Sequence, residues 1–178
     1  MTSWMTRAAG VAMISMTGFA ALAPAAMAQE STNRVATMTD WSVFADKNPT
    51  ECWGVSSPKE TVNTKDGKPV SVRRGDILLF VTFRPGVKGE TSFSGGYPFA
   101  PGSTVKLDVD GTTFDLFSDG EWAWPGTTED DATILAALKK GTTAVLTARS
   151  AKGTQTKDSF SLRGFTAAMD EAAKQCAN

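Results

Sequence analysis

The 178-residue chain contains no histidine. Without an imidazole side chain it has no Ser-His-Asp or Cys-His catalytic arrangement, no histidine-ligated zinc and no histidine proton shuttle near neutral pH. These enzyme and metal-site classes are therefore excluded before any motif is considered.

The chain also lacks an excess of charge of either sign. It has 18 basic and 19 acidic residues, and Arg7 is the only charged residue among the first 28. The remaining part therefore has a net charge of −2. An electrostatic nucleic-acid binder needs a basic face to neutralise phosphates, so we expect no nucleic-acid partner.

Long apolar runs are absent after residue 28. The one such run, at residues 8–23, follows Arg7 and precedes the small-residue site Ala26-Met27-Ala28. This layout is typical of a secretory signal peptide at residues 1–28, cleaved after Ala28. The run is shorter than the roughly 20 residues of a membrane span, so a retained anchor is the less favoured alternative. We expect a periplasmic or secreted protein with no membrane span in its mature chain.

Cysteine occurs only twice, as Cys52 and Cys176. In an oxidising compartment an even pair favours a disulfide over two free thiols. Such a bond closes a long loop, and in the chain-entropy model it stabilises the fold by about 4–5 kcal/mol.

Residues 29–40 are polar and aperiodic, and we expect them to form a loose leader. Residues 41–178 contain short segments rich in β-branched and aromatic residues, which predict a single all-β domain of two packed antiparallel sheets. Val105, Leu107 and Val109 alternate with charged residues, and the next two residues, Asp110-Gly111, predict a hairpin turn. The predicted strands lie at 41–44, 52–55, 69–73, 77–83, 91–94, 105–109, 114–116, 121–124, 144–148 and 159–162.

Two peripheral helices interrupt this pattern. Thr128 can cap the first helix, which Gly141 ends, and its apolar stripe is Ile134, Leu135 and Leu138. The second covers about residues 166–176. Its inward face holds Met169, Ala172, Ala173 and Cys176, so Cys176 can reach Cys52 if this helix packs across the first strands.

Two patterns suggest chemistry but have simpler explanations. Ser56-Ser57-Pro58-Lys59 matches the Ser-x-x-Lys motif of penicillin-recognising enzymes, but Pro58 predicts a turn and the companion motifs are missing, so we attribute it to chance. Four acids suggest calcium, although their spacing is not that of an EF-hand and a solvated strand face explains them better. These are Asp108, Asp110, Asp115 and Asp119. We expect neither a metal nor a cofactor.

The aromatic residues are the better candidates for a binding surface. Tyr97 and Phe99 lie in a predicted loop, and alternation places Trp122 and Trp124 on one strand face, where they can contact a sugar or a protein. The alternative is that the tryptophans are core residues.

Several segments in order resemble the invasion-associated locus B family of secreted alphaproteobacterial proteins. They span residues 41–176 and include Trp41 with Cys52, Val81-Thr82-Phe83-Arg84-Pro85, Gly96-Tyr97-Pro98-Phe99, Ala123-Trp124, Ala137-Leu138-Lys139-Lys140-Gly141, Ser150-x-x-Gly153-Thr154 and Asp158-Ser159-Phe160-Ser161-Leu162. The resemblance implies a secreted immunoglobulin-like β-sandwich with no known catalytic residues. It also implies, for pathogenic members, an association with entry into host cells.

Together these observations predict a secreted non-catalytic envelope protein that binds a protein or a cell-envelope component. One alternative is a carbohydrate-binding module that uses the tryptophan face. Another is a small hydrolase with two carboxylates, which only their separation in space can test.

Overall fold

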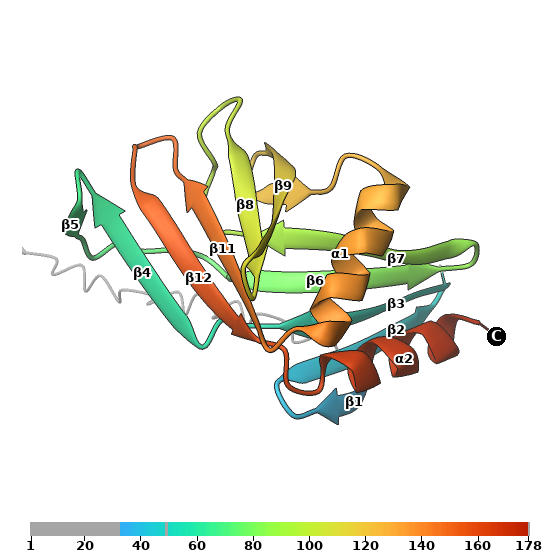
Figure 1. The fold of residues 1–178 in the computed structure, drawn as a ribbon. Helices are drawn as coiled ribbons and strands as arrows, with labels where there is room; N and C mark the ends of the chain where they lie inside the picture. Colours follow the sequence, from blue (N-terminus) through green and yellow to red (C-terminus); the bar gives the residue numbers. More distant parts are fainter. Residues whose placement is uncertain (1–32, 49, 178) are drawn as a thin grey trace, which may run out of the picture. The chain divides into compact units, whose positions relative to one another are not determined.

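The computed structural model describes residues 33–48 and 50–177, which form twelve strands and two helices. The predicted signal peptide and its cleavage site after Ala28 lie outside these residues. All twelve strands join one antiparallel sheet in the order β1-β2-β3-β6-β7-β10-β9-β8-β11-β12-β4-β5 (Figure 1). Their bounds are β1 Arg34–Met38, β2 Trp41–Lys47, β3 Thr50–Ser56, β4 Glu60–Lys65, β5 Lys68–Pro69, β6 Leu78–Arg84, β7 Val87–Ser94, β8 Thr104–Val109, β9 Thr112–Asp119, β10 Trp122–Trp124, β11 Thr143–Arg149 and β12 Gln155–Ser161.

The sheet folds over on itself, which confirms the predicted all-β sandwich. In Figure 1, β2, β3, β6 and β7 form one layer, and β4, β8, β11 and β12 cross them as the other layer. Phe93 on β7 meets Phe160 on β12 edge to face, with ring centroids 6.2 Å apart. The two layers belong to one sheet, and not to the two separate sheets that were predicted. The hydrogen-bonded ladder is continuous, because the short strand β10 pairs with β7 on one side and with β9 on the other.

The core between the layers follows the predicted alternation. On β8, Val105, Leu107 and Val109 are buried, whereas Lys106 is exposed. The turn that follows β8 has positive φ angles at both of its residues, 46° at Asp110 and 94° at Gly111. A two-residue hairpin requires this geometry.

Helix α1 (Thr128–Lys140) has Thr127, and not Thr128, as its N-cap residue. Thr127 has extended backbone angles, and its hydroxyl oxygen accepts a hydrogen bond from the Asp130 N–H at 3.1 Å. Two adjacent threonines offer the same capping signal, so only the backbone geometry separates them. Ile134 and Leu138 are buried as predicted.

Helix α2 (Phe165–Cys176) covers the inner side of β2 and β3 at one side of the sandwich. Its Met169 lies directly over Gly54 of β3, where a Cβ atom would come within 2.1 Å of the Met169 methyl carbon. Cys176 forms a disulfide with Cys52, and their Cα atoms are 5.8 Å apart. The described residues contain two helices, α1 and α2, and neither is long and apolar enough to cross a membrane.

The predicted loose leader is wrong for Arg34–Met38, which pair with β2 as strand β1. β1 is an edge strand with a partner on one side only. It therefore needs no continuous apolar pattern, and the sequence offered no such signal.

The predicted strand at 69–73 is also wrong beyond its first residue. Only Lys68–Pro69 pair with β4, as strand β5, and no ladder includes residues 70–73. β4 itself was not predicted, because most of its residues are polar and at least partly exposed. Both strands lie at the far edge of the sheet, where hydrophobic alternation is weakest.

Candidate functional site

The four aromatic residues predicted to form a binding surface lie in three different environments. Trp122 and Trp124 project outward from β10 and are 45% and 42% exposed, whereas Ala123 between them is buried. The interpretation of these tryptophans as core residues is therefore wrong. Tyr97 is half-buried beside a hollow. Phe99 is a core residue that stacks on Phe93, so it is not available to a partner.

Trp122 and Trp124 belong to a larger aromatic surface on the outer side of the sheet. Residues paired across neighbouring strands share a face. On β9, Phe117 pairs with Trp124, and the ring of Phe80 on β6 lies 5.7 Å from that of Trp122. The surface continues onto β2 and β3, where two more rings stack 5.5 Å apart. We define the outer aromatic face as Phe44, Trp53, Phe80, Phe117, Trp122 and Trp124.

The exposed end of this face lies on β9 and β10. Phe117 is 60% exposed, more than either tryptophan of β10, whereas the rings on β2, β3 and β6 are half-buried. Phe117 and Trp53 were not predicted to be surface residues. Strand alternation contains the signal, because a residue that follows an inward Leu116 or Cys52 must point outward.

A groove of about 400 Å³ lies beside Trp124, where the chain leaves the sheet towards α1. One wall is the segment from Trp124 to Thr128, and the other consists of side chains on β6 and β7. Arg84 crosses this second wall and forms ion pairs with Glu90 and with Glu51. The polar residues that line the groove are Thr82, Arg84, Glu90, Thr91, Ser92, Thr127, Thr128 and Asp131.

Asp131 takes over the role of a strand partner at this groove. β10 pairs with β7 only through Trp122 and Ala123, so the backbone of Thr91 has no strand partner on that side. The Asp131 carboxylate instead accepts a hydrogen bond from the Thr91 N–H at 2.7 Å. Burial raises the pKa of Asp131, and this hydrogen bond opposes the shift. The carboxylates of Asp131 and Glu90 are thus both engaged within the fold.

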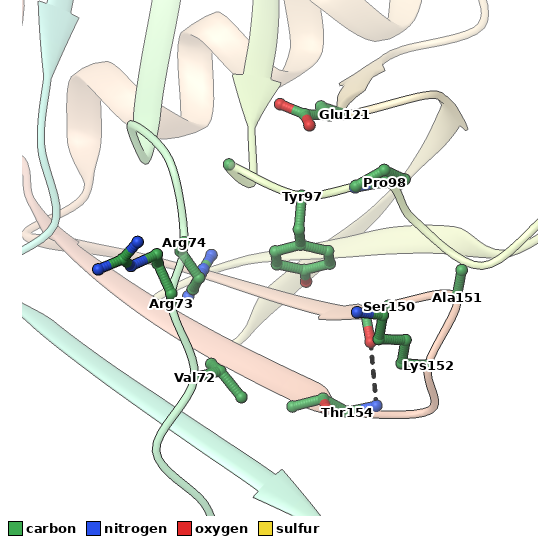
Figure 2. A pocket seen from close by; sticks show the side chains of 11 residues that line it. Val72, Arg73, Arg74, Tyr97, Pro98, Glu121, Ser150, Ala151, Lys152 and Thr154 are labelled. Atoms are coloured by element: carbon green, nitrogen blue, oxygen red, sulfur yellow. Dashed lines mark hydrogen bonds between the residues drawn. The ribbon is translucent and has the colours of Figure 1, made fainter. Parts of the chain in front are cut away.

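A second hollow, of about 530 Å³, surrounds Tyr97 (Figure 2). The Tyr97 hydroxyl lies 2.6 Å from the Thr156 hydroxyl in a hydrogen bond, and the Arg74 guanidinium carbon lies 5.0 Å from the centre of the Tyr97 ring. Burial raises the pKa of Tyr97, and the hydrogen bond to Thr156 opposes this shift. In Figure 2, Arg73 points away from this ring, whereas Arg74 extends towards it.

The positive charge of Arg74, next to the Tyr97 ring, is neutralised by a buried carboxylate. Arg74 donates two hydrogen bonds of 2.7 Å to the Asp158 carboxylate and two more to the Gly95 carbonyl oxygen. The side chains of Arg74 and Asp158 are 6% and 0% exposed. Since its donors are occupied, Arg74 holds the loop to β12 and is not free to bind a ligand.

Most of the other predicted chemical groups have structural partners. The Ser56 hydroxyl donates to the Asp40 carbonyl oxygen, and the Lys59 ammonium pairs with the Asp40 carboxylate. The Asp110 carboxylate accepts hydrogen bonds from the backbone and hydroxyl of Thr142, which hold the pKa of Asp110 below its usual value. Within residues 33–48 and 50–177, no three metal-ligating side chains are grouped to hold an ion.

Comparisons with known proteins agree with this architecture. The family model described as "Invasion associated locus B (IalB) protein" matches residues 41–173. The crystal structure of invasion associated protein b from Bartonella henselae is similar, with a TM-score of 0.56 and 17% sequence identity over 80% of this chain and 98% of that chain. No curated protein matches the chain.

Proposed function

Because the chain belongs to the invasion-associated locus B family, we propose that it is a secreted, non-catalytic binding protein. Its partner is a protein or a cell-envelope component, and the outer aromatic face is the contact surface. In pathogenic bacteria the same role extends to contact with host cells.

The exposure of Phe117, Trp122 and Trp124 is the observation that carries this proposal. Three large aromatic side chains on adjacent strands are 60%, 45% and 42% exposed. Burying them inside the sandwich would have stabilised the fold by about 1.5–3 kcal/mol for each side chain of this size. Contiguous exposed apolar surface on a soluble domain is typical of an interaction site, and tryptophan is enriched among residues that dominate binding energy.

Two further features support export and binding without catalysis. The signal-peptide pattern of residues 1–28 and the bonded pair Cys52–Cys176 fit an oxidising compartment outside the cytoplasm. The buried charges nearest the two hollows are engaged within the fold, with Arg74 on Asp158 and Asp131 on the Thr91 N–H. These charged groups are therefore not free to act as the general acid and general base that hydrolysis needs.

The test is capture of the partner from native periplasm and envelope extracts by mature protein, residues 29–178. We expect W122A/W124A to retain the wild-type melting temperature and to lose most of the capture. Val62→Ala is the matched control, because Val62 is 42% exposed but lies on β4, near one end of the sheet and away from β10. Equal capture by a folded W122A/W124A protein would refute the proposal.

A further inference from the structure

The groove beside Trp124 combines one aromatic side chain with several polar ones. Trp124 is 42% exposed, and the groove volume of about 400 Å³ lies within the range of small-ligand sites, roughly 300–1,000 Å³. We infer that this groove is a binding subsite for a neutral saccharide chain, an inference that rests on the proposed binding role of the outer aromatic face.

The aromatic and the polar side chains match the two kinds of surface on a sugar ring. A pyranose presents C–H bonds on one face, and these carry partial positive charge that the negative face of an indole ring attracts. Its hydroxyls, at the ring edge, each donate and accept hydrogen bonds. The groove supplies both kinds of partner through the hydroxyls of Thr82 and Ser92, each of which can donate and accept a hydrogen bond.

The neighbouring aromatic residues favour a chain of sugars over a single ring. Trp122 lies two residues from Trp124 on the same strand face, a separation of about 7 Å along the strand. Phe117 on β9 pairs with Trp124, and its ring packs against Gly126, which lines the groove. The sugar rings of a chain that extends out of the groove therefore contact further aromatic side chains.

The charges of the groove select against acidic sugars. Arg84 pairs with both Glu90 and Glu51, and Asp131 adds a third carboxylate nearby. One guanidinium among three carboxylates leaves no free positive charge for a uronate, sulfate or phosphate group. A neutral glycan meets no such repulsion.

The inference is tested by isothermal titration calorimetry with defined hexasaccharides. The probes are the neutral β-1,4-linked hexamers of glucose, N-acetylglucosamine and mannose, and the hexamer of galacturonate as the acidic comparison. We expect binding of at least one neutral hexamer and none of the galacturonate hexamer. W124A should weaken the neutral complex about ten-fold or more, whereas W124F, which keeps an aromatic platform, should retain most of it.

The outcomes separate this inference from the proposed function. If no neutral hexamer binds, or if W124A binds as well as wild type, the saccharide subsite is refuted. In that case, capture from envelope extracts that still depends on Trp122 and Trp124 leaves the proposed function standing, with a protein partner. Loss of both saccharide binding and tryptophan-dependent capture refutes both. Val62→Ala serves again as the folded control.

Discussion

At the scale of single residues, buried polar groups determine how the loop at Tyr97 is attached to the sandwich. Asp158 is fully buried on β12, and its carboxylate is matched by the Arg74 guanidinium. Taking a charge out of water is costly unless it is paired, so each member of this pair depends on the other.

We predict that Asp158→Asn destabilises the domain by about 3–5 kcal/mol, because it leaves Arg74 buried without a counter-charge. Asp115→Asn is the comparison, since it breaks the exposed Asp115–Lys106 ion pair and should cost less than about 1 kcal/mol. Urea denaturation of both variants measures the difference. Similar losses from the two substitutions would show that the buried pair has no special role.

Asp131 should make stability depend on pH in an unusual direction. Because its pKa is raised in the folded state, its contribution is fully present below the unfolded pKa and is lost as the pH rises through the folded pKa. Asp131→Asn keeps an acceptor for the Thr91 N–H but does not titrate. The free energy of unfolding of wild type, minus that of D131N, should therefore fall between pH 3 and pH 7.

Asp131→Ala provides the control for this prediction, because it removes the acceptor altogether. We expect it to destabilise the domain at neutral pH by about 1–3 kcal/mol more than D131N, the cost of an unsatisfied buried donor. A wild-type minus D131N difference that rises with pH would contradict the assigned burial of this carboxylate.

At the scale of elements, the N-terminus of α1 is set by one threonine of an adjacent pair. Thr127 bonds the Asp130 N–H, whereas the Thr128 hydroxyl bonds only the neighbouring Glu129 carboxylate. Thr127→Ala should therefore cost about 1 kcal/mol, and Thr128→Ala less than about 0.5 kcal/mol. Thermal denaturation measures both, and the reverse order would place the helix start one residue later.

The sequence predicted the strands that have one solvent-exposed face and one buried face. Alternation identified β8 and β9, and the Asp110-Gly111 turn joined them, because period-two burial and positive φ each leave a local signal. The same signal was absent from the edge strand β1 and from β4, which lies next to the edge strand β5. Their pairing with β2 and β12 depends on contacts distant in sequence, which local patterns do not contain.

The candidate site was predicted only in part, for a similar reason. Alternation alone places Trp122 and Trp124 on one face, but the choice between core and solvent depends on which side the second layer covers. The same limit applies to Phe99, whose loop position suggested exposure although its ring packs on Phe93. The groove itself could not be predicted, because it forms where β10 ends against β7.

At the scale of the whole molecule, the disulfide ties the C-terminal helix to one of the first strands. Cys52 and Cys176 are separated by 124 residues in sequence. Replacing both with serine should lower the free energy of unfolding by about 4–5 kcal/mol, because the unfolded chain regains the entropy of a long open loop. Urea denaturation measures this loss, and addition of reductant should affect wild type alone. Equal stability of the two proteins would contradict the role given to this bond.

The central claim is that the outer aromatic face contacts a partner outside the cytoplasm. Photo-crosslinking in living cells tests it most directly, with the full chain carrying p-benzoylphenylalanine at position 117 or, as a control, at position 62. Phe117 and Val62 are both exposed, at 60% and 42%, but only Phe117 belongs to this face. We predict a light-dependent adduct of higher mass from position 117 and none from position 62. No adduct from 117, or the same adduct from both positions, would contradict the account.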